Sequence, residues 1–248
     1  MEKNEKFCMY FHGFAVAHHI NAILYTTFGH LTHNIHEVTD ERVLDLKRFE
    51  NKYFTGWNLG LQFLYFTLAF TLDLMKHWKL HPNKKLVKFK GYMFTNLVFP
   101  CSAFVCCMFW TVYTINREYV FPEIFDHYIP AWFNHSVHTN ILIFILLEIF
   151  MVNHYMASFK SAFYSLLGLS LLYNIVFFHN YFEHGKWLYI LFNIFSWTEI
   201  ILFVNFNFLA CLVFQRVGYF IQKYKFRWSK KKIITKYEQY KKDLLIKN

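Results

Sequence analysis

Six long runs of apolar residues constrain this chain more than any other feature. They cover approximately residues 7–28, 53–75, 92–115, 132–152, 161–180 and 188–214. Each approaches the roughly 20 residues that an α-helix needs to cross a hydrocarbon core about 30 Å thick. Helices that are apolar all round lie in a large protein core or in lipid, and 248 residues cannot enclose six of them. The sequence therefore predicts an all-α, polytopic integral membrane bundle of about six transmembrane helices.

The first apolar run is the weakest of the six, because His12, His18, His19 and Asn21 interrupt it. A secretory signal peptide has a shorter apolar stretch, which is followed by a cleavage site of small residues. In this chain the stretch is long and no such site follows it. We therefore expect a retained membrane anchor.

The positions of the charged residues predict an orientation. The chain carries 26 Lys and Arg against 16 Asp and Glu. These residues lie between and after the apolar runs, a pattern typical of membrane topology signals and not of nucleic-acid binding. If both termini are cytoplasmic, 20 of the 26 basic residues fall on the cytoplasmic side, as expected for cytoplasmic loops. The second and fourth runs then both begin on the opposite side of the membrane.

The composition changes after residue 222. Apolar residues recur there at helical spacing among many lysines, namely Ile233, Tyr237, Tyr240 and Leu244. This pattern is typical of a basic amphipathic helix that lies on an anionic leaflet. We therefore divide the chain into a six-helix transmembrane domain, residues 1–222, and a basic amphipathic cytoplasmic tail, residues 223–248. A solvated, disordered tail is the alternative.

Cysteine and histidine are the residues that a metal centre would need. The five cysteines lie in apolar runs without a CxxC pair, so they indicate buried small side chains and neither disulfides nor zinc. His30, His33 and His36 are regularly spaced but fall in a loop on the far side, where a solvated polar loop is the simpler interpretation. We expect no metal and no cofactor, and a metal-dependent lipid oxidase is kept as a rival hypothesis.

Polar residues inside two of the apolar runs are the candidates for chemistry, because polar groups are costly in hydrocarbon. Thr55 and Asn58 share one helix face at the start of the second run, together with Gln62. Asn134 and His138 share a face at the start of the fourth. Hydrogen bonding between helices is the alternative role for each of them.

Two stretches of the sequence resemble a known family. They are KYFTGWNL at residues 52–59, and FP at 121–122 continuing to IPAWFNHSVHT at 129–139. This combination of a threonine on one span and W-x-N-H-x-x-H-T on another resembles the androgen-induced gene one family. The resemblance covers roughly residues 52 to 199, whereas the first run and the tail match poorly.

The resemblance implies a multi-span hydrolase of fatty acid esters of hydroxy fatty acids. By motif position, it assigns the nucleophile to Thr55 and the catalytic histidine to His138; His135 also fits the motif. Asn58 or Asn134 would then donate a hydrogen bond to the oxyanion. Two departures from the family pattern bear on the pocket. Gly56 replaces a bulky residue, and the segment 185–189 lacks the proline that usually follows its tyrosine.

The predicted topology is compatible with such a pair. Thr55 and His138 lie two and six residues into spans that begin on the same side, so their depths differ by roughly 6 Å. The implied partners are the membrane and a lipid substrate, with no nucleic acid, and the endoplasmic reticulum and the plasma membrane fit equally well. The alternative is a non-enzymatic membrane regulator or carrier, in which both side chains only join helices.

Overall fold

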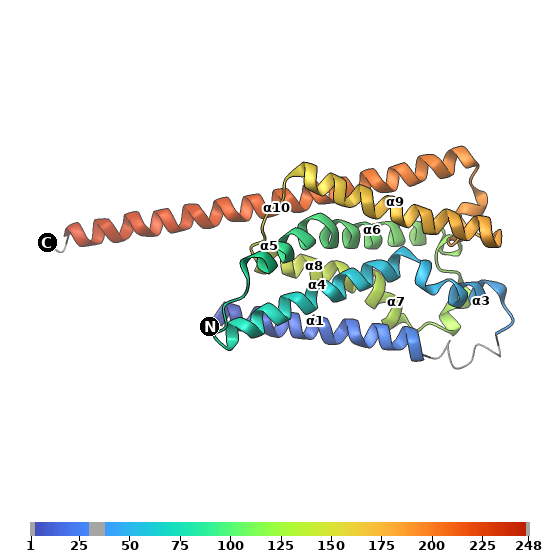
Figure 1. Ribbon diagram of the computed structural model, residues 1–248, viewed down its shortest axis with the longest axis horizontal. Helices are drawn as coiled ribbons and strands as arrows, with labels where there is room; N and C mark the ends of the chain where they lie inside the picture. Colours follow the sequence, from blue (N-terminus) through green and yellow to red (C-terminus); the bar gives the residue numbers. More distant parts are fainter. Residues whose placement is uncertain (1–2, 30–37, 247–248) are drawn as a thin grey trace.

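The computed structural model describes residues 3–29 and 38–246, with side chains from 4 to 29 and from 38 to 227. Its regular elements are all helical (Figure 1). In chain order they are α1 (Lys3–Phe28), α3 (Glu41–Arg48), η2 (Glu50–Lys52), α4 (Phe54–His77), α5 (Lys84–Met93), the π-helical turn η3 (Phe94–Val98), α6 (Phe99–Asn116), η4 (Arg117–Tyr119), η5 (Glu123–His127), α7 (Ala131–His138), α8 (Asn140–Met151), α9 (Phe159–His184), η6 (Ile190–Ile194) and α10 (Trp197–Ile246).

Three helical stretches of the described residues are long and apolar enough to cross a membrane. They are Lys84–Tyr119, Phe159–His184 and Trp197–Arg227. The pair α7 and α8, which is bent by 41°, adds a fourth if it forms one span. The prediction of an all-helical membrane protein is thus confirmed. The length and composition of the helices support three to four spans, compared with the six that the sequence predicts. The helices α1 and α4 have the necessary length but carry several buried polar side chains, which lower their hydropathy.

Two predicted spans differ in detail from the helices observed. The fourth run is broken at Thr139, between α7 and α8. The sixth run begins at residue 188, but α10 begins only at Trp197. Gly185 ends α9 in the left-handed conformation that glycine adopts without strain. The apolar residues that follow, such as Leu188 and Phe192, fold back against the end of the bundle, so their hydrophobicity reflects burial in a turn.

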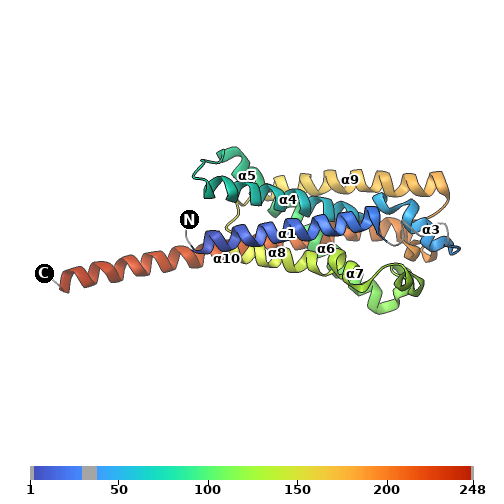
Figure 2. The same cartoon turned by 90° about the horizontal axis from the view of Figure 1, so that it is seen from below.

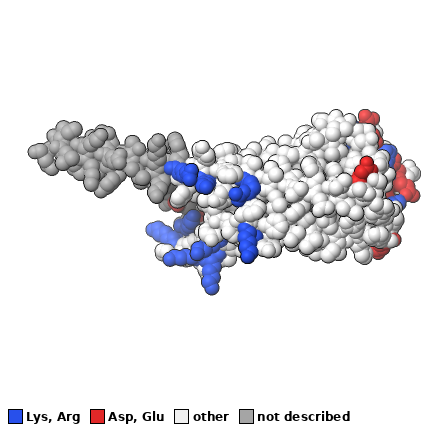
Figure 3. Space-filling model, turned by 90° about the horizontal axis from the view of Figure 1, so that it is seen from above, with Lys and Arg blue, Asp and Glu red and all other residues white. Residues whose placement is uncertain are grey.

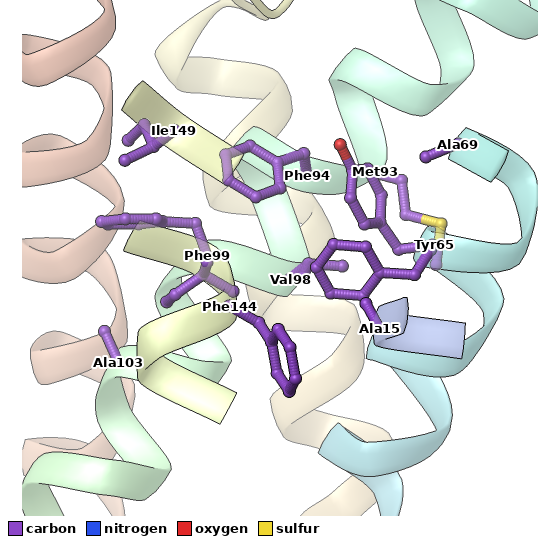
Figure 4. Close-up of a cluster of buried hydrophobic side chains, with 12 residues drawn as sticks. Ala15, Tyr65, Ala69, Met93, Phe94, Val98, Phe99, Ala103, Phe144 and Ile149 are labelled. Atoms are coloured by element: carbon purple, nitrogen blue, oxygen red, sulfur yellow. The ribbon is translucent and has the colours of Figure 1, made fainter. Parts of the chain in front are cut away.

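The helices run along one common direction, with α1 beside α4, and α6 between α8 and α10 (Figures 1 and 2). Figure 4 shows the main core, in which Tyr65, Phe94, Phe99 and Phe144 meet from α4, η3, α6 and α8. Helices approach closely there: a Cβ atom built on Gly218 would lie 2.7 Å from the Phe99 ring.

The two ends of the bundle carry opposite charges (Figure 3). Lysines gather at the end where α5 lies, and acidic residues gather at the end where α3 lies. Helix α1 begins and α10 ends toward the lysine-bearing end (Figure 1). We call the two ends the basic end and the acidic end.

A cluster of buried ionisable side chains lies toward the basic end. His12 Nδ1 lies 2.7 Å from Asp73 Oδ2, and its Nε2 lies 2.7 Å from Glu148 Oε2. The Tyr65 hydroxyl also donates to Glu148, and His154 Nε2 lies 3.3 Å from the same carboxylate. From the sequence alone, Glu148 has no evident partner. In the structure, Glu148 therefore belongs to a buried network of ionisable side chains that joins α1, α4 and α8.

Several other predictions can be placed on the structure. The five cysteines are free, and Cys107 is exposed, contrary to the expectation that all are buried. Glu199, a carboxylate within the sixth apolar run, is exposed and accepts hydrogen bonds from Ser196 at the start of α10. Helix α10 runs through residue 222 without a break, and its amphipathic character stays a prediction, because side chains beyond 227 lie outside the described ones. His30, His33 and His36 also lie outside the described residues.

Candidate active site

Thr55 and His138 meet near the acidic end of the bundle. Thr55 is the second residue of α4, and His138 is the last residue of α7. The Thr55 Oγ1 atom lies 3.3 Å from His138 Nε2, although 83 residues separate the two positions. The structure therefore brings together the two side chains that the resemblance singles out.

Asn134 fixes the orientation of the His138 imidazole. The Nδ1 atom of His138 lies 2.7 Å from Asn134 Oδ1 and 3.2 Å from the Asn134 carbonyl oxygen. Both oxygens can only accept, so Nδ1 carries the proton and donates it. In the neutral ring, Nε2 is then left with a lone pair that faces the Thr55 hydroxyl. This is the tautomer that a general base needs.

Phe109 restricts the same ring from its face. The Phe109 and His138 rings are stacked, with centroids 3.5 Å apart and an interplanar angle of 9°. Phe109 comes from α6 and is itself buried. With Asn134 on one edge and Phe109 on the face, the imidazole is held in one position before any ligand binds.

Two of the other predicted site residues do not reach this pair. Asn58 is buried and accepts a hydrogen bond from Ser102 Oγ at 2.9 Å. It thereby joins a polar seam between helices that continues through Gln62 to His19. His135 is exposed, stacks on Trp110 and contacts Thr139 Oγ1 at 3.0 Å. Neither Asn58 nor His135 lines the cavity described next, whereas Asn134 does.

A largely apolar cavity of about 330 Å³ opens beside Thr55 and His138. One part is lined by α1, η5 and α7, for example by Phe125 and Phe133. Another part extends between α6, α9 and α10, where Leu166, Phe208 and Cys211 line it. A cavity of this size and lining suits a hydrophobic ligand. The pair lies where α4 and α7 border the cavity, so both parts of it are within reach of the reacting atoms.

Two tyrosines on the cavity wall were not anticipated from the sequence. The Phe54 N–H at the start of α4 donates to Tyr189 Oη at 3.1 Å. The Tyr173 and Tyr189 hydroxyl oxygens lie 3.2 Å apart. A single tyrosine in an aromatic-rich apolar run carries no distinguishing signal. The one available hint was that Tyr189 falls in the segment 185–189, where the family pattern is altered.

Ion pairs at the acidic end hold the segment that carries Tyr189. Lys186 Nζ donates to Asp45 Oδ2 and Glu41 Oε2, each at 2.7 Å. The Asp45 and Glu41 carboxylates raise the pKa of Lys186, and the hydrogen bond from Lys186 lowers the pKa of Glu41. These side chains are solvent-accessible, so the pairs contribute little to stability. They nevertheless tie the turn after α9 to α3.

Within the described ranges, His, Cys, Asp and Glu side chains form no group of three or more that could hold a metal ion.

Comparison with known proteins finds one family model. The model of the FAR-17a/AIG1-like protein family matches residues 13–223. The androgen-dependent TFPI-regulating protein of Mesocricetus auratus is 33% identical over 184 residues, which cover 71% of this chain and 77% of that protein. The androgen-induced gene 1 protein of Homo sapiens is 30% identical over 146 residues, covering 56% and 61%. No solved structure matches.

Proposed function

Because the chain belongs to the FAR-17a/AIG1-like family, we propose that it is a membrane-embedded lipid esterase with Thr55 as nucleophile and His138 as base. The proposed substrates are fatty acid esters of hydroxy fatty acids, the class that the resemblance implies. The observation that carries the proposal is the 3.3 Å approach of Thr55 Oγ1 to an oriented His138 Nε2 beside an apolar cavity. A threonine hydroxyl is a weak nucleophile at neutral pH and needs such a base.

The proposed reaction proceeds in two acyl transfers. The Nε2 atom of His138 takes the Thr55 proton as Oγ1 attacks the ester carbonyl carbon. When the tetrahedral intermediate collapses, the imidazolium gives that proton to the departing oxygen of the hydroxy fatty acid, and an acyl-threonine remains. Water then attacks the acyl-threonine with His138 again as base, which releases the fatty acid and restores the Thr55 hydroxyl.

The membrane setting proposed for this reaction follows from the charges. We infer six crossing helices, α1, α4, α5–α6, α7–α8, α9 and α10, with the basic end cytoplasmic and the acidic end on the opposite side. The reacting pair then lies near the non-cytoplasmic face of the endoplasmic reticulum or plasma membrane. Exposed apolar side chains cover the flanks of the bundle, so a substrate dissolved in the bilayer reaches the protein laterally.

The proposal is tested with purified protein in lipid nanodiscs and a branched ester of a hydroxy fatty acid. We expect release of both acids, and mass spectrometry of quenched samples should find one acyl group on the peptide that contains Thr55. Folded protein that neither cleaves the ester nor becomes acylated would contradict the proposal and favour a non-enzymatic regulator or carrier. Turnover that depends on near-stoichiometric iron would favour a lipid oxidase instead.

The contact between Asn134 and His138 makes a separate prediction. Replacing Asn134 with alanine removes one hydrogen bond to the imidazole, an interaction worth about 1 kcal/mol. We expect kcat to fall roughly five- to tenfold with a smaller change in KM, since Asn134 is one residue of a largely apolar cavity wall and its Oδ1 is engaged by His138. Steady-state kinetics on the purified variant measure both quantities.

The variant Asn134→Asp is the matched control for this prediction, because its carboxylate can still accept from Nδ1. It should recover most of the wild-type kcat. If Asn134→Ala leaves kcat unchanged, whether or not the two variants are less stable than the wild type, then Asn134 does not position the histidine.

A further inference from the structure

Acyl transfer to Thr55 creates a requirement that the pair itself does not meet. As Oγ1 adds to the ester, negative charge develops on the former carbonyl oxygen. In an apolar cavity this charge needs hydrogen-bond donors that are already in position. The inference that follows rests on the proposed function, and it concerns which group of this chain supplies the donor.

Most polar side chains on the cavity wall are already engaged. Lys47 Nζ donates to both oxygens of Glu50 and to the Thr26 carbonyl. The Tyr25 hydroxyl donates to the Tyr128 carbonyl, and Asn134 Oδ1 is used by His138. Asn58, the other donor expected from the sequence, does not line the cavity: its Oδ1 accepts from Ser102 in the polar seam, and its buried Nδ2 has no hydrogen-bond partner. The Asn134 contact uses only the amide oxygen, so its Nδ2 is a second donor on the His138 side of the cavity. The tyrosine pair is the candidate donor at the start of α4, where Thr55 lies.

The Tyr189 hydroxyl lies at the helix turn that carries the nucleophile. Its Oη is 3.1 Å from the backbone nitrogen of Phe54, which directly precedes Thr55. Tyr53 is the N-cap of α4 and provides no side-chain cap. The Thr55 N–H, as one of the first four in the helix, has no intrahelical acceptor. The first turn of α4 thus has a backbone donor at Thr55, a phenol against the N–H of the preceding residue, and the positive end of the helix dipole.

One of the two hydroxyl protons of Tyr173 and Tyr189 is free to be donated to a third group. Tyr173 and Tyr189 together hold two hydroxyl protons, and only one can lie between their oxygens, which are 3.2 Å apart. The Phe54 N–H brings its own proton, so Tyr189 Oη serves it as an acceptor. When Tyr173 donates to Tyr189, the Tyr189 proton is left for a group in the cavity. An oxygen that accepts two hydrogen bonds is also polarised into a stronger donor.

Tyr189 is held firmly enough to act in this way. Its ring lies 5.4 Å from that of Tyr53, at 83°. Two positions earlier, Trp187 stacks on Tyr181 with centroids 3.9 Å apart. Lys186 ties the same turn to α3 through Asp45 and Glu41. A donor that needs no reorganisation during the reaction is the most effective kind.

We infer that Tyr189 is a catalytic residue, whose phenol, together with the Thr55 N–H, stabilises the oxyanion of the tetrahedral intermediate. Tyr173 is a positioning residue that acts through Tyr189. The turn 186–196 after α9 therefore completes the active site, instead of only connecting two membrane helices.

The test compares Tyr189→Phe with the wild type in nanodiscs. We expect kcat to fall roughly a hundredfold, as for other oxyanion donors, with KM within about twofold. Two inhibitors sharpen the comparison: a trifluoromethyl ketone, which forms a hemiketal oxyanion on Thr55, and its methyl ketone analogue, which does not. The variant should lose affinity for the fluorinated compound by at least tenfold more than for the methyl ketone.

Tyr164→Phe is the matched control, since Tyr164 is exposed on α9 and does not line the cavity; it should keep the wild-type kcat. Tyr173→Phe should lower kcat severalfold, and this result tests the inference even if Tyr189→Phe does not fold. The inference would be overturned by wild-type kcat in both Tyr189→Phe and Tyr173→Phe, or by equal losses of affinity for the two ketones. If Thr55→Ala is inactive in the same experiment, the proposed esterase function still stands. Full activity in Thr55→Ala would instead remove the proposed function.

Discussion

Replacing Thr55 with alanine should abolish ester hydrolysis while leaving the protein folded, with kcat lowered by roughly a thousandfold or more. The substitution removes the only atom that can form the acyl-enzyme in the proposed reaction, and His138 alone would have to activate water in its place. Thr55 makes one described side-chain hydrogen bond, at 3.3 Å to His138. The expected loss of stability is therefore small compared with the loss of activity.

This result is measured as acid release in nanodiscs, with labelling by a fluorophosphonate probe as a second readout. Thr55→Ser should keep measurable turnover and labelling, because it retains a hydroxyl at the same position. Thr114→Ala is the neutral control, since Thr114 is exposed and bonds only within its own helix. A folded Thr55→Ala variant that still turns over at the wild-type rate would exclude Thr55 as the nucleophile.

The largest effect on stability is expected at the other end of the bundle. Glu148 is fully buried and is contacted by His12, Tyr65 and His154. Both nitrogens of His12 face carboxylates, those of Asp73 and Glu148. Each of the two contacts needs one proton between nitrogen and oxygen, so the three side chains together share two protons. Glu148→Ala leaves these partners buried and incompletely paired, and it should lower the free energy of unfolding by roughly 3–5 kcal/mol.

Unfolding by denaturant in bicelles measures this change, and a double-mutant cycle with His12→Ala isolates the pair. Glu199→Ala is the matched control, because this carboxylate is exposed and only caps α10; its effect should stay within about 1 kcal/mol. An equally small effect for Glu148→Ala would mean that the buried network does not stabilise the fold. Eighteen residues of α4 separate Asp73 from Thr55, about 27 Å, so folded Glu148→Ala should retain its kcat.

The apolar runs and the polar side chains at their starts allowed much of this structure to be predicted. Run length predicts helices wherever lipid surrounds them, and the charge pattern placed Thr55 and His138 at similar depths. Contacts between distant segments could not be predicted in this way. Two members of the Glu148 network lie far away in the sequence: His12, 136 residues away, and Asp73 through that histidine. Nothing local to residue 148 signals either of them.

The turn that precedes α10 shows why apolar content alone misleads. Leu188, Phe192 and their neighbours have the composition of a span, but they pack with Phe49 and Phe177 beneath the acidic end. Burial in protein and burial in lipid favour the same residue types. As a result, the sequence predicts the last helix to begin at residue 188, whereas this segment is a turn that brings Tyr189 to the start of α4.

Helix α10 is longer than a membrane crossing requires. Its 50 residues correspond to about 75 Å, while a bilayer with its headgroups is about 40–45 Å thick. The sequence has no proline between 197 and 246 that would bend the helix. If α10 crosses a bilayer from its first turn and stays straight, its last turns extend about 30 Å beyond the opposite lipid surface, whereas a tail that lies on the leaflet, as the sequence predicts, requires a bend near residue 222.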